Sequence, residues 1–163
     1  MREWEFILLK NIDRKKEVLD VEPSSHDFNE KEIHEWTGNM SDKLKKECYL
    51  KALPIQRKML MNAPELLIVC FRMKKPLKNC KTLFDLNSFA SVWACIENIL
   101  LAMAAEGLYG VTKIPFETDD LKRKLGIPED YEVAAMIPIG YPQEHFVKQK
   151  TILMQEKMHY DKW

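Results

Sequence analysis

The stretch Asn87–Gly107, NSFASVWACIENILLAMAAEG, decides how the rest of the chain is interpreted. Its large apolar side chains recur at helical spacing, at Phe89, Val92, Trp93, Ile96, Leu100 and Met103. Asn87 or Ser88 can cap the start of a helix, and Gly107 can take the left-handed conformation that closes one. The sequence therefore predicts a helix over these residues.

The opposite side of this predicted helix is also apolar, and its residues are mostly small: Ala90, Ala94, Leu101, Ala104 and Ala105. A helix that is apolar all round is buried, so we expect it in a domain core or at a subunit interface. Its length approaches that of a membrane span, but Glu97 and Asn98 at its centre would be costly in lipid. We therefore expect no membrane partner.

Strand patterns lie on both sides of the helix. Trp4–Lys10 and Tyr131–Ile139 are short runs rich in strand-forming residues, and Leu66–Phe71 is a continuous apolar run typical of a strand buried on both faces. Tyr109–Pro115 follows the helix as a further short strand that ends at a proline. The mixture of helix and strand patterns predicts an α+β fold.

Shorter helices are expected between these strands. Asp13–Asp20 reads as a polar helix, Ile55–Leu60 as a helical turn, and Thr118–Leu125 as a helix capped by the Thr118 hydroxyl and ended by Gly126. The chain of 163 residues suits a single domain, residues 1–163. Within it, residues 21–51 are charged and irregular and suit a variable, lid-like segment or a solvated connector, and residues 143–163 form a C-terminal arm.

Composition narrows the function classes. Lys+Arg and Asp+Glu number 25 each, so no net field favours nucleic acid as a partner. The four cysteines share no CxxC spacing, which indicates free thiols, and the histidines have no ligand spacing that would indicate a metal site. Because the N-terminus does not resemble a secretory signal, we expect a cytoplasmic protein.

Five segments in order carry a family resemblance: WEFILL near the start, RKML before a strand that follows a proline, ENILLAMAAEGLYGV, LGIPEDYEVAAMIPIGYP, and a closing HYDKW. In this order and spacing the chain resembles the FMN-dependent nitroreductase family. The resemblance implies a three-layer α/β/α sandwich around a mixed sheet, built as an intertwined homodimer with flavin sites at the interface. FMN would accept hydride from NADH or NADPH and reduce a nitroaromatic, quinone or similar organic acceptor.

The resemblance also implies where FMN would be held. Lys58 in RKML matches a lysine that faces the pyrimidine edge of the flavin, where a cation stabilises negative charge on reduction. Lys148 and Lys150 match the region that binds the FMN phosphate. For these lysines, a solvated surface position is the alternative interpretation.

A backbone segment is implied near flavin N5: Lys113, Ile114, Pro115 and Phe116. Because Pro115 has no N–H, a hydrogen bond to N5 would come from Ile114 or Phe116. The flavin itself carries the chemistry, so no catalytic side chain is expected.

The chain departs from the family pattern at its start. Members begin with a helix and an Arg-rich segment that grips the FMN phosphate and ribityl chain, whereas Met1–Phe6 corresponds to the end of that region. We therefore expect those contacts to be missing. Two alternatives to the flavin enzyme follow: a shortened scaffold that dimerises without flavin, and a protein that binds another planar ligand in the interface pocket.

Overall fold

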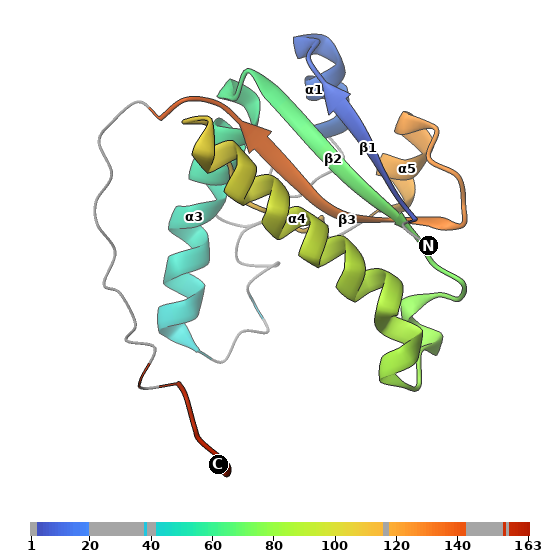
Figure 1. Ribbon diagram of the computed structural model, residues 1–163. Coiled ribbons are helices and arrows are strands. Elements are labelled where there is room, and N and C mark those ends of the chain that lie inside the picture. Colours follow the sequence, from blue (N-terminus) through green and yellow to red (C-terminus); the bar gives the residue numbers. More distant parts are fainter. Residues whose placement is uncertain (1–2, 20–37, 39–41, 116–117, 143–154, 156) are drawn as a thin grey trace.

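The computed structural model describes residues 3–19, 38, 42–115, 118–142, 155 and 157–163 (Figure 1). Along the chain the elements are β1 (Trp4–Leu9), α1 (Ile12–Leu19), α3 (Lys43–Asn62), β2 (Glu65–Arg72), the 3-10 turns η2 (Leu77–Asn79) and η3 (Leu83–Leu86), α4 (Asn87–Ala105), α5 (Asp119–Leu125) and β3 (Tyr131–Ile139). The predicted α+β class is confirmed.

The sheet has the order β1-β2-β3, with β2 hydrogen-bonded along both edges. β1 pairs with β2 from Trp4↔Phe71 to Leu9↔Leu66, and β2 pairs with β3 from Glu65↔Ile139 to Arg72↔Tyr131. Both pairings are antiparallel. The parallel pairing that a mixed sheet requires does not occur among the described strands.

A bulge in β3 decides which residues face each side of the sheet. Val69 pairs with Ala135, but the next residue, Cys70, pairs with Val133. Ala134 is therefore the extra residue, and it lies on the same side as Ala135. Without it, the alternation of side chains would place Val133 on the wrong face.

Helices cover both faces of the sheet. One face carries Leu66, Ile68, Cys70, Val133 and Met136, and these residues form a core with side chains of α1, α3 and α5. The other face carries Val69, Phe71, Ala134, Ala135 and Ile137, and packs against Val92, Ile96 and Met103 of α4. Figure 1 shows α4 crossing the sheet on its own side. The expected three layers are present.

The start of α4 differs from the sequence prediction. The helix continues directly from η3, and neither Asn87 nor Ser88 caps it. Instead Thr82 and Asp85 form a capping box one 3-10 turn earlier, with the Asp85 amide donating to Thr82 Oγ1 at 3.3 Å and the Thr82 amide donating to Asp85 Oδ2 at 3.0 Å. At the other end Gly107 has φ +71°, the left-handed conformation that the sequence predicted.

The outer side of α4 is exposed in the single chain, contrary to the expectation of burial all round. Leu101 is 60% exposed, and Ala90, Ala94 and Ala104 are exposed beside it. The stretch Leu83–Ala105 is long and apolar enough to span a membrane by length and composition. Its inner side is nevertheless part of the sheet's core. Of the two expected locations, the domain core accounts for the inner side of α4 only. The subunit interface remains the expectation for its outer side.

Two other boundaries differ from the sequence prediction. α3 begins at Lys43, capped by Asp42, whose Oδ1 accepts from the Lys45 amide at 3.1 Å, so residues 43–51 of the expected irregular segment are helical. Residues 21–37 and 39–41 lie outside the described residues. α5 ends at Gly126 as predicted, but the Thr118 hydroxyl makes no capping bond.

The predicted strand over 109–115 is reduced to two isolated bridges, Tyr109↔Gly140 and Lys113↔Met136. The two pairs share one antiparallel register, in which Val111 would oppose Pro138. Because Pro138 has no N–H, the middle rung of the ladder lacks a donor. This segment therefore lies along the free edge of β3 as an interrupted fourth strand.

Two leucines test how far the sheet core carries stability. Leu66 is fully buried, whereas Leu44 on α3 is 72% exposed. We expect Leu66→Ala to lower the free energy of unfolding by about 3 kcal/mol, because the substitution removes buried apolar surface and leaves a cavity. We expect Leu44→Ala to change the free energy of unfolding by less than about 0.5 kcal/mol. Urea denaturation of the two variants measures this, and equal losses would contradict the core assignment.

Candidate functional site

An open cleft of about 510 Å³ lies between the end of α3 and the edge of β3. This volume falls within the range of roughly 300–1,000 Å³ that ligand sites occupy. Its lining comes from three segments: Ile55, Lys58, Met59, Asn62, Ala63 and Pro64; Tyr109, Gly110 and Val111; and Pro138, Gly140, Tyr141 and Pro142.

The wall from α3 follows helical periodicity. Ile55, Lys58, Met59 and Asn62 stand at positions i, i+3, i+4 and i+7, so they share one face of the helix. Leu60 lies on the opposite side and is fully buried in the sheet core, which fixes the orientation of this face. In the described lining, Lys58 is the one charged side chain. The cleft is thus an apolar site with a single cation on its wall.

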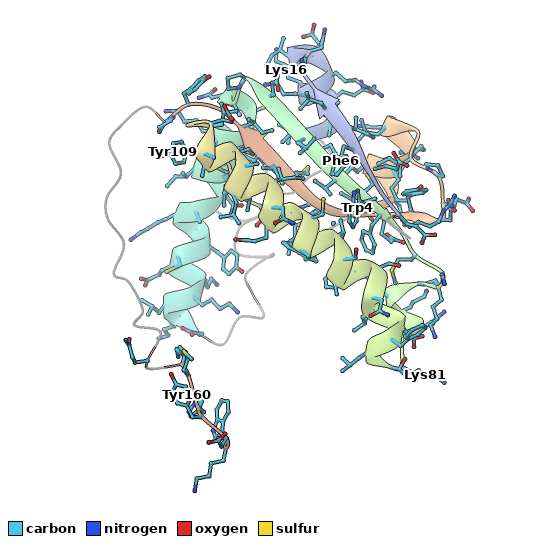
Figure 2. The ribbon with its side chains drawn as sticks, in the orientation of Figure 1. Trp4, Phe6, Lys16, Lys81, Tyr109 and Tyr160 are labelled. Carbon is cyan, nitrogen blue, oxygen red and sulfur yellow. The ribbon has the colours of Figure 1, made fainter. Side chains whose placement is uncertain are left out.

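The opposite wall is held to β3 by the backbone. The Tyr109 amide donates to the Gly140 carbonyl at 2.8 Å, and the Gly140 amide donates to the Tyr109 carbonyl at 3.1 Å. Gly110 sits so close to β3 that an added Cβ would lie 2.7 Å from the Pro138 carbonyl oxygen and 2.8 Å from Met103 Cε. Only glycine fits there without movement. Figure 2 shows Tyr109 at the end of α4, on the side of α3.

The segment implied near flavin N5 continues from this wall but does not line the cleft itself. Lys113 is buried, its backbone bonds reciprocally to Met136 at 2.8 Å, and its Nζ lies 3.4 Å from the Ile114 carbonyl oxygen. Ile114 is 61% exposed, and its amide has no acceptor among the residues that the structure describes. Pro115 is buried. Of the two predicted donors, Ile114 is accessible, and Phe116 lies outside the described residues.

Lys58 is therefore the predicted site residue that the structure places in the cleft, while Lys113, Ile114 and Pro115 lie on the adjoining segment. Lys148 and Lys150 lie outside the described residues. The sequence interpretation missed Asn62 and Tyr141. Asn62 follows Lys58 by four residues, and Tyr141 stands in the noted Gly-Tyr-Pro turn, so both had a signal in the sequence.

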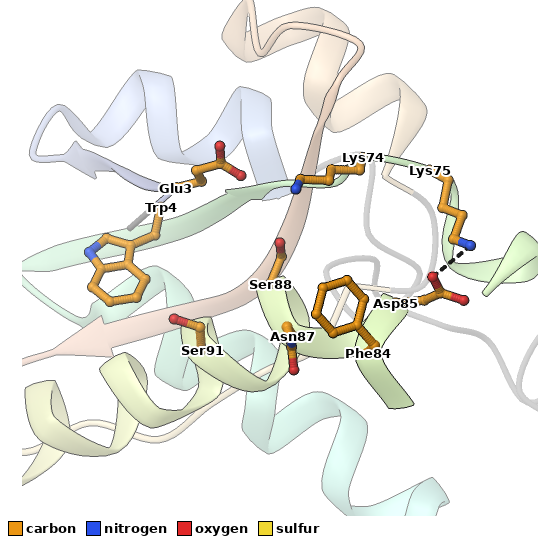
Figure 3. A pocket seen from close by; sticks show the side chains of 9 residues that line it. All are labelled: Glu3, Trp4, Lys74, Lys75, Phe84, Asp85, Asn87, Ser88 and Ser91. Carbon is orange, nitrogen blue, oxygen red and sulfur yellow. Dashed lines mark ion pairs between the residues drawn. The ribbon is translucent and has the colours of Figure 1, made fainter. Parts of the chain in front are cut away.

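A second cavity of about 380 Å³ lies between the start of β1, the loop after β2 and the start of α4 (Figure 3). Lys75 Nζ lies 2.6 Å from Asp85 Oδ1, and Asp85 Oδ2 accepts from the Lys81 and Thr82 amides. The bond to Lys75 and these amides hold the pKa of the Asp85 carboxyl well below its usual range. Asp85 therefore stabilises the turn that starts α4, and none of the predicted site residues that the structure describes line this cavity.

The Nitroreductase family model matches residues 1–141 of the chain. The chain belongs to the nitroreductase family. Among curated proteins, the iodotyrosine deiodinase of Thermotoga neapolitana is 25% identical over 141 residues, which cover 86% of this chain and 67% of that protein.

Solved structures share the nitroreductase fold with this chain. A BluB-like flavoprotein from Clostridium difficile 630 superimposes with a TM-score of 0.71 at 19% identity, over 98% of this chain and 80% of that one. An oxidised iodotyrosine deiodinase bound to FMN and 3-iodo-L-tyrosine has a TM-score of 0.65 at 21% identity, over 93% of this chain and 74% of that one. The predicted family and fold are confirmed.

Gly110 offers a test of the wall beside β3. We expect Gly110→Ala to lower the free energy of unfolding by about 1–3 kcal/mol, because the new methyl group must push the segment away from the Pro138 carbonyl. Gly140→Ala is the comparison, since its Cβ would meet the Pro64 ring at 3.0 Å and a smaller shift relieves it. Thermal unfolding of both variants measures the difference. An unchanged midpoint in Gly110→Ala would contradict the close packing.

Proposed function

We propose that this protein is an FMN-dependent NAD(P)H oxidoreductase that reduces a nitroaromatic, a quinone or a similar small organic acceptor. The observation that carries the proposal is the position of Lys58, the cation on the wall of an apolar cleft, in a chain of the nitroreductase family. Two of the solved relatives support the cofactor by their own contents, because one is bound to FMN and the other is a flavoprotein.

The described residues fit the ring system of FMN. Met59, Val111, Pro138 and the other apolar side chains form walls suited to a planar aromatic group. Ile114, an exposed residue on the adjoining segment, supplies a backbone amide that has no acceptor among the described residues. For the phosphate we propose Lys148 and Lys150, on the resemblance alone. The proposal therefore rests on the ring end of the site.

FMN, when bound, supplies the exchange of hydride and electrons between the nicotinamide donor and the acceptor. The chain's own residues orient it and set its electrostatic environment. Lys58 would stabilise negative charge at the pyrimidine edge, and the Ile114 amide would donate a hydrogen bond toward the opposite, N5 side. A bound ring would cover part of the apolar walls, and an electrostatic interaction from which water is excluded is stronger. No side chain is required to transfer a proton.

We further propose that the active unit is a homodimer formed through the outer side of α4. The exposed outer side of α4 is largely apolar, with Glu97 between Ala94 and Leu101, and an exposed apolar face of this kind marks an interface. The helix leads into the Tyr109 wall of the cleft. At the C-terminus, Tyr160 is 75% and Trp163 100% exposed, as aromatic residues of an arm that packs on a second subunit would be in a single chain (Figure 2).

All four cysteines are free thiols, which suits the proposed cytoplasmic location.

Spectroscopy and turnover test the flavin proposal. We expect the purified protein, supplied with FMN, to bind it and show the absorbance of an oxidised flavin, to lose that absorbance with NADH or NADPH, and to regain it with an acceptor. A nitroaromatic, a quinone and 3-iodo-L-tyrosine serve as three acceptor probes, the last because of the deiodinase relatives. A folded protein that does not bind FMN would instead support one of the two alternatives: a scaffold that dimerises without flavin, or a protein that binds another planar ligand.

Lys58→Met tests the role of the cation. The change keeps the approximate length of the side chain and removes its charge, so we expect the Kd for FMN to rise roughly tenfold. A hydrogen bond to a charged group contributes about 1.5–3 kcal/mol, and solvent exposure of Lys58 lowers this contribution. Lys51→Met is the matched control, since Lys51 is an exposed lysine on the same helix that does not line the cleft. Equal affinities in the two variants would remove Lys58 from the site.

Leu101→Glu tests the dimer. The new carboxylate would lie one helical turn after Glu97 and would be buried beside it on association. Because desolvation and like-charge repulsion both oppose this, we expect the variant to elute as a monomer in size-exclusion chromatography with light scattering. Leu44→Glu, at an exposed leucine of α3, should leave the elution unchanged. A dimeric Leu101→Glu protein would place the interface elsewhere.

A further inference from the structure

Adjacent cations on α1 cap the ends of two other helices. Arg14 donates through Nη2 to the Lys124 carbonyl at the end of α5. Lys15 reaches the other way: its Nζ donates to the Ala63 carbonyl at 2.5 Å and lies 3.4 Å from the Met61 carbonyl, both at the end of α3. One short helix therefore fixes the C-terminal ends of α3 and α5.

Lys15 is unusual because it is almost fully buried, with 3% of its surface exposed. Burial lowers the pKa of this lysine, since an ammonium group loses hydration there. The carbonyls at a helix C-terminus lack partners within the helix and carry the negative end of its dipole, so a cation is favoured beside them. α3 has no basic residue in its own last turn. Lys15 supplies that cation from a different helix.

The end of α3 that Lys15 holds is also the wall of the cleft. Ala63, whose carbonyl accepts the bond, lines the cleft together with Asn62 and Pro64, and Lys58 precedes them by about one helical turn. Pro64 in turn lies close to Gly140 on the opposite wall. A displacement of this helix end would therefore change both the width of the cleft and the position of the Lys58 ammonium.

We propose that Lys15 is a positioning residue for the cofactor: it holds the last turn of α3 so that Lys58 faces the bound ring. This inference rests on the proposed function. Lys15 does not itself line the cleft, so its effect on affinity must pass through the end of α3, where it bonds to the Ala63 carbonyl. A lysine that only stabilised the fold would change the unfolding midpoint and leave the affinity of the folded protein unchanged.

The chain offers matched variants for this test. Lys15→Met removes the charge and the donors but keeps an apolar chain of similar length. Arg14→Met removes the neighbouring cap, which serves α5 and not the cleft wall. Lys16→Met is a surface control on the same helix, since Lys16 is exposed. Lys15→Gln keeps a polar group at the buried position and serves if Lys15→Met does not fold.

The experiment measures the Kd for FMN by titration at a temperature where circular dichroism shows each variant folded. We expect Lys15→Met to raise the Kd roughly tenfold, and Arg14→Met and Lys16→Met to stay within about twofold of the parent. In a double-mutant cycle, Lys15→Met should add little to Lys58→Met, because both changes remove the same interaction. Hydrogen exchange without FMN should be faster at the amides of Met59–Ala63 in Lys15→Met alone.

Unchanged affinity in folded Lys15→Met or Lys15→Gln, or effects that multiply fully with Lys58→Met, would overturn the positioning role while leaving the flavin proposal standing. If the unsubstituted protein does not bind FMN, the proposed function fails, and the positioning role fails with it. In that case hydrogen exchange still reports whether Lys15 caps α3, so the two failures are distinguishable.

Discussion

The rest of the structure depends on the burial of the central strand β2, which is covered along both edges and on both faces. Its two edges are hydrogen-bonded to β1 and β3, and its two faces are buried under α4 on one side and under α1, α3 and α5 on the other. A strand in this position can carry no exposed polar side chain in its middle, which is why Leu66–Phe71 is a continuous apolar run. Every wall of the cleft is attached to this strand directly or through β3.

The cleft arises where regular pairing at the edge of the sheet fails. β3 could accept a fourth strand along its free edge, but Pro138 removes one donor from that edge, and residues 109–113 attach at only two points. Between those points Val111 has no ladder bond and lines the cleft beside Gly110. On the other side, the helix face of α3 that lines the cleft carries two polar residues, Lys58 and Asn62, and two apolar ones, Ile55 and Met59. Pro138 and Gly110 thus shape the candidate cleft at an otherwise ordinary sheet edge.

Much of this fold followed from local patterns in the sequence. Three features are determined by residues that are neighbours in the sequence, and the structure confirms them: the periodicity of α4, the apolar run of β2, and the helix ends at Gly107 and Gly126, where φ is positive. The start of α3 was missed because residues 21–51 read as one charged, irregular segment, so the helical pattern was recognised only from Ile55. The break opposite Pro138 was missed because it depends on a register between segments that are distant in the sequence.

The candidate site was predictable only in part, for a similar reason. Lys58 could be named from a family resemblance, but its place on the cleft depends on Leu60 facing the core from the same helix. The apolar outer side of α4 is a property of the sequence, whereas its proposed burial would depend on a second subunit. Lys15 gave no signal at all, since Arg14-Lys15-Lys16 reads as a solvated basic run until the end of α3 is placed against it.

Lys15 also shows why stability alone does not identify residues that shape a site. The lowered pKa means that the folded protein disfavours the charged lysine. Its contribution to stability is therefore lowest below the folded pKa and rises with pH up to the unfolded value of about 10.4. Removing the lysine relieves that cost but leaves carbonyls unpaired, at about 1–3 kcal/mol for a buried group. The two effects have opposite signs, so the free energy of unfolding can stay nearly constant while the end of α3, and the cation it carries, is no longer held in place.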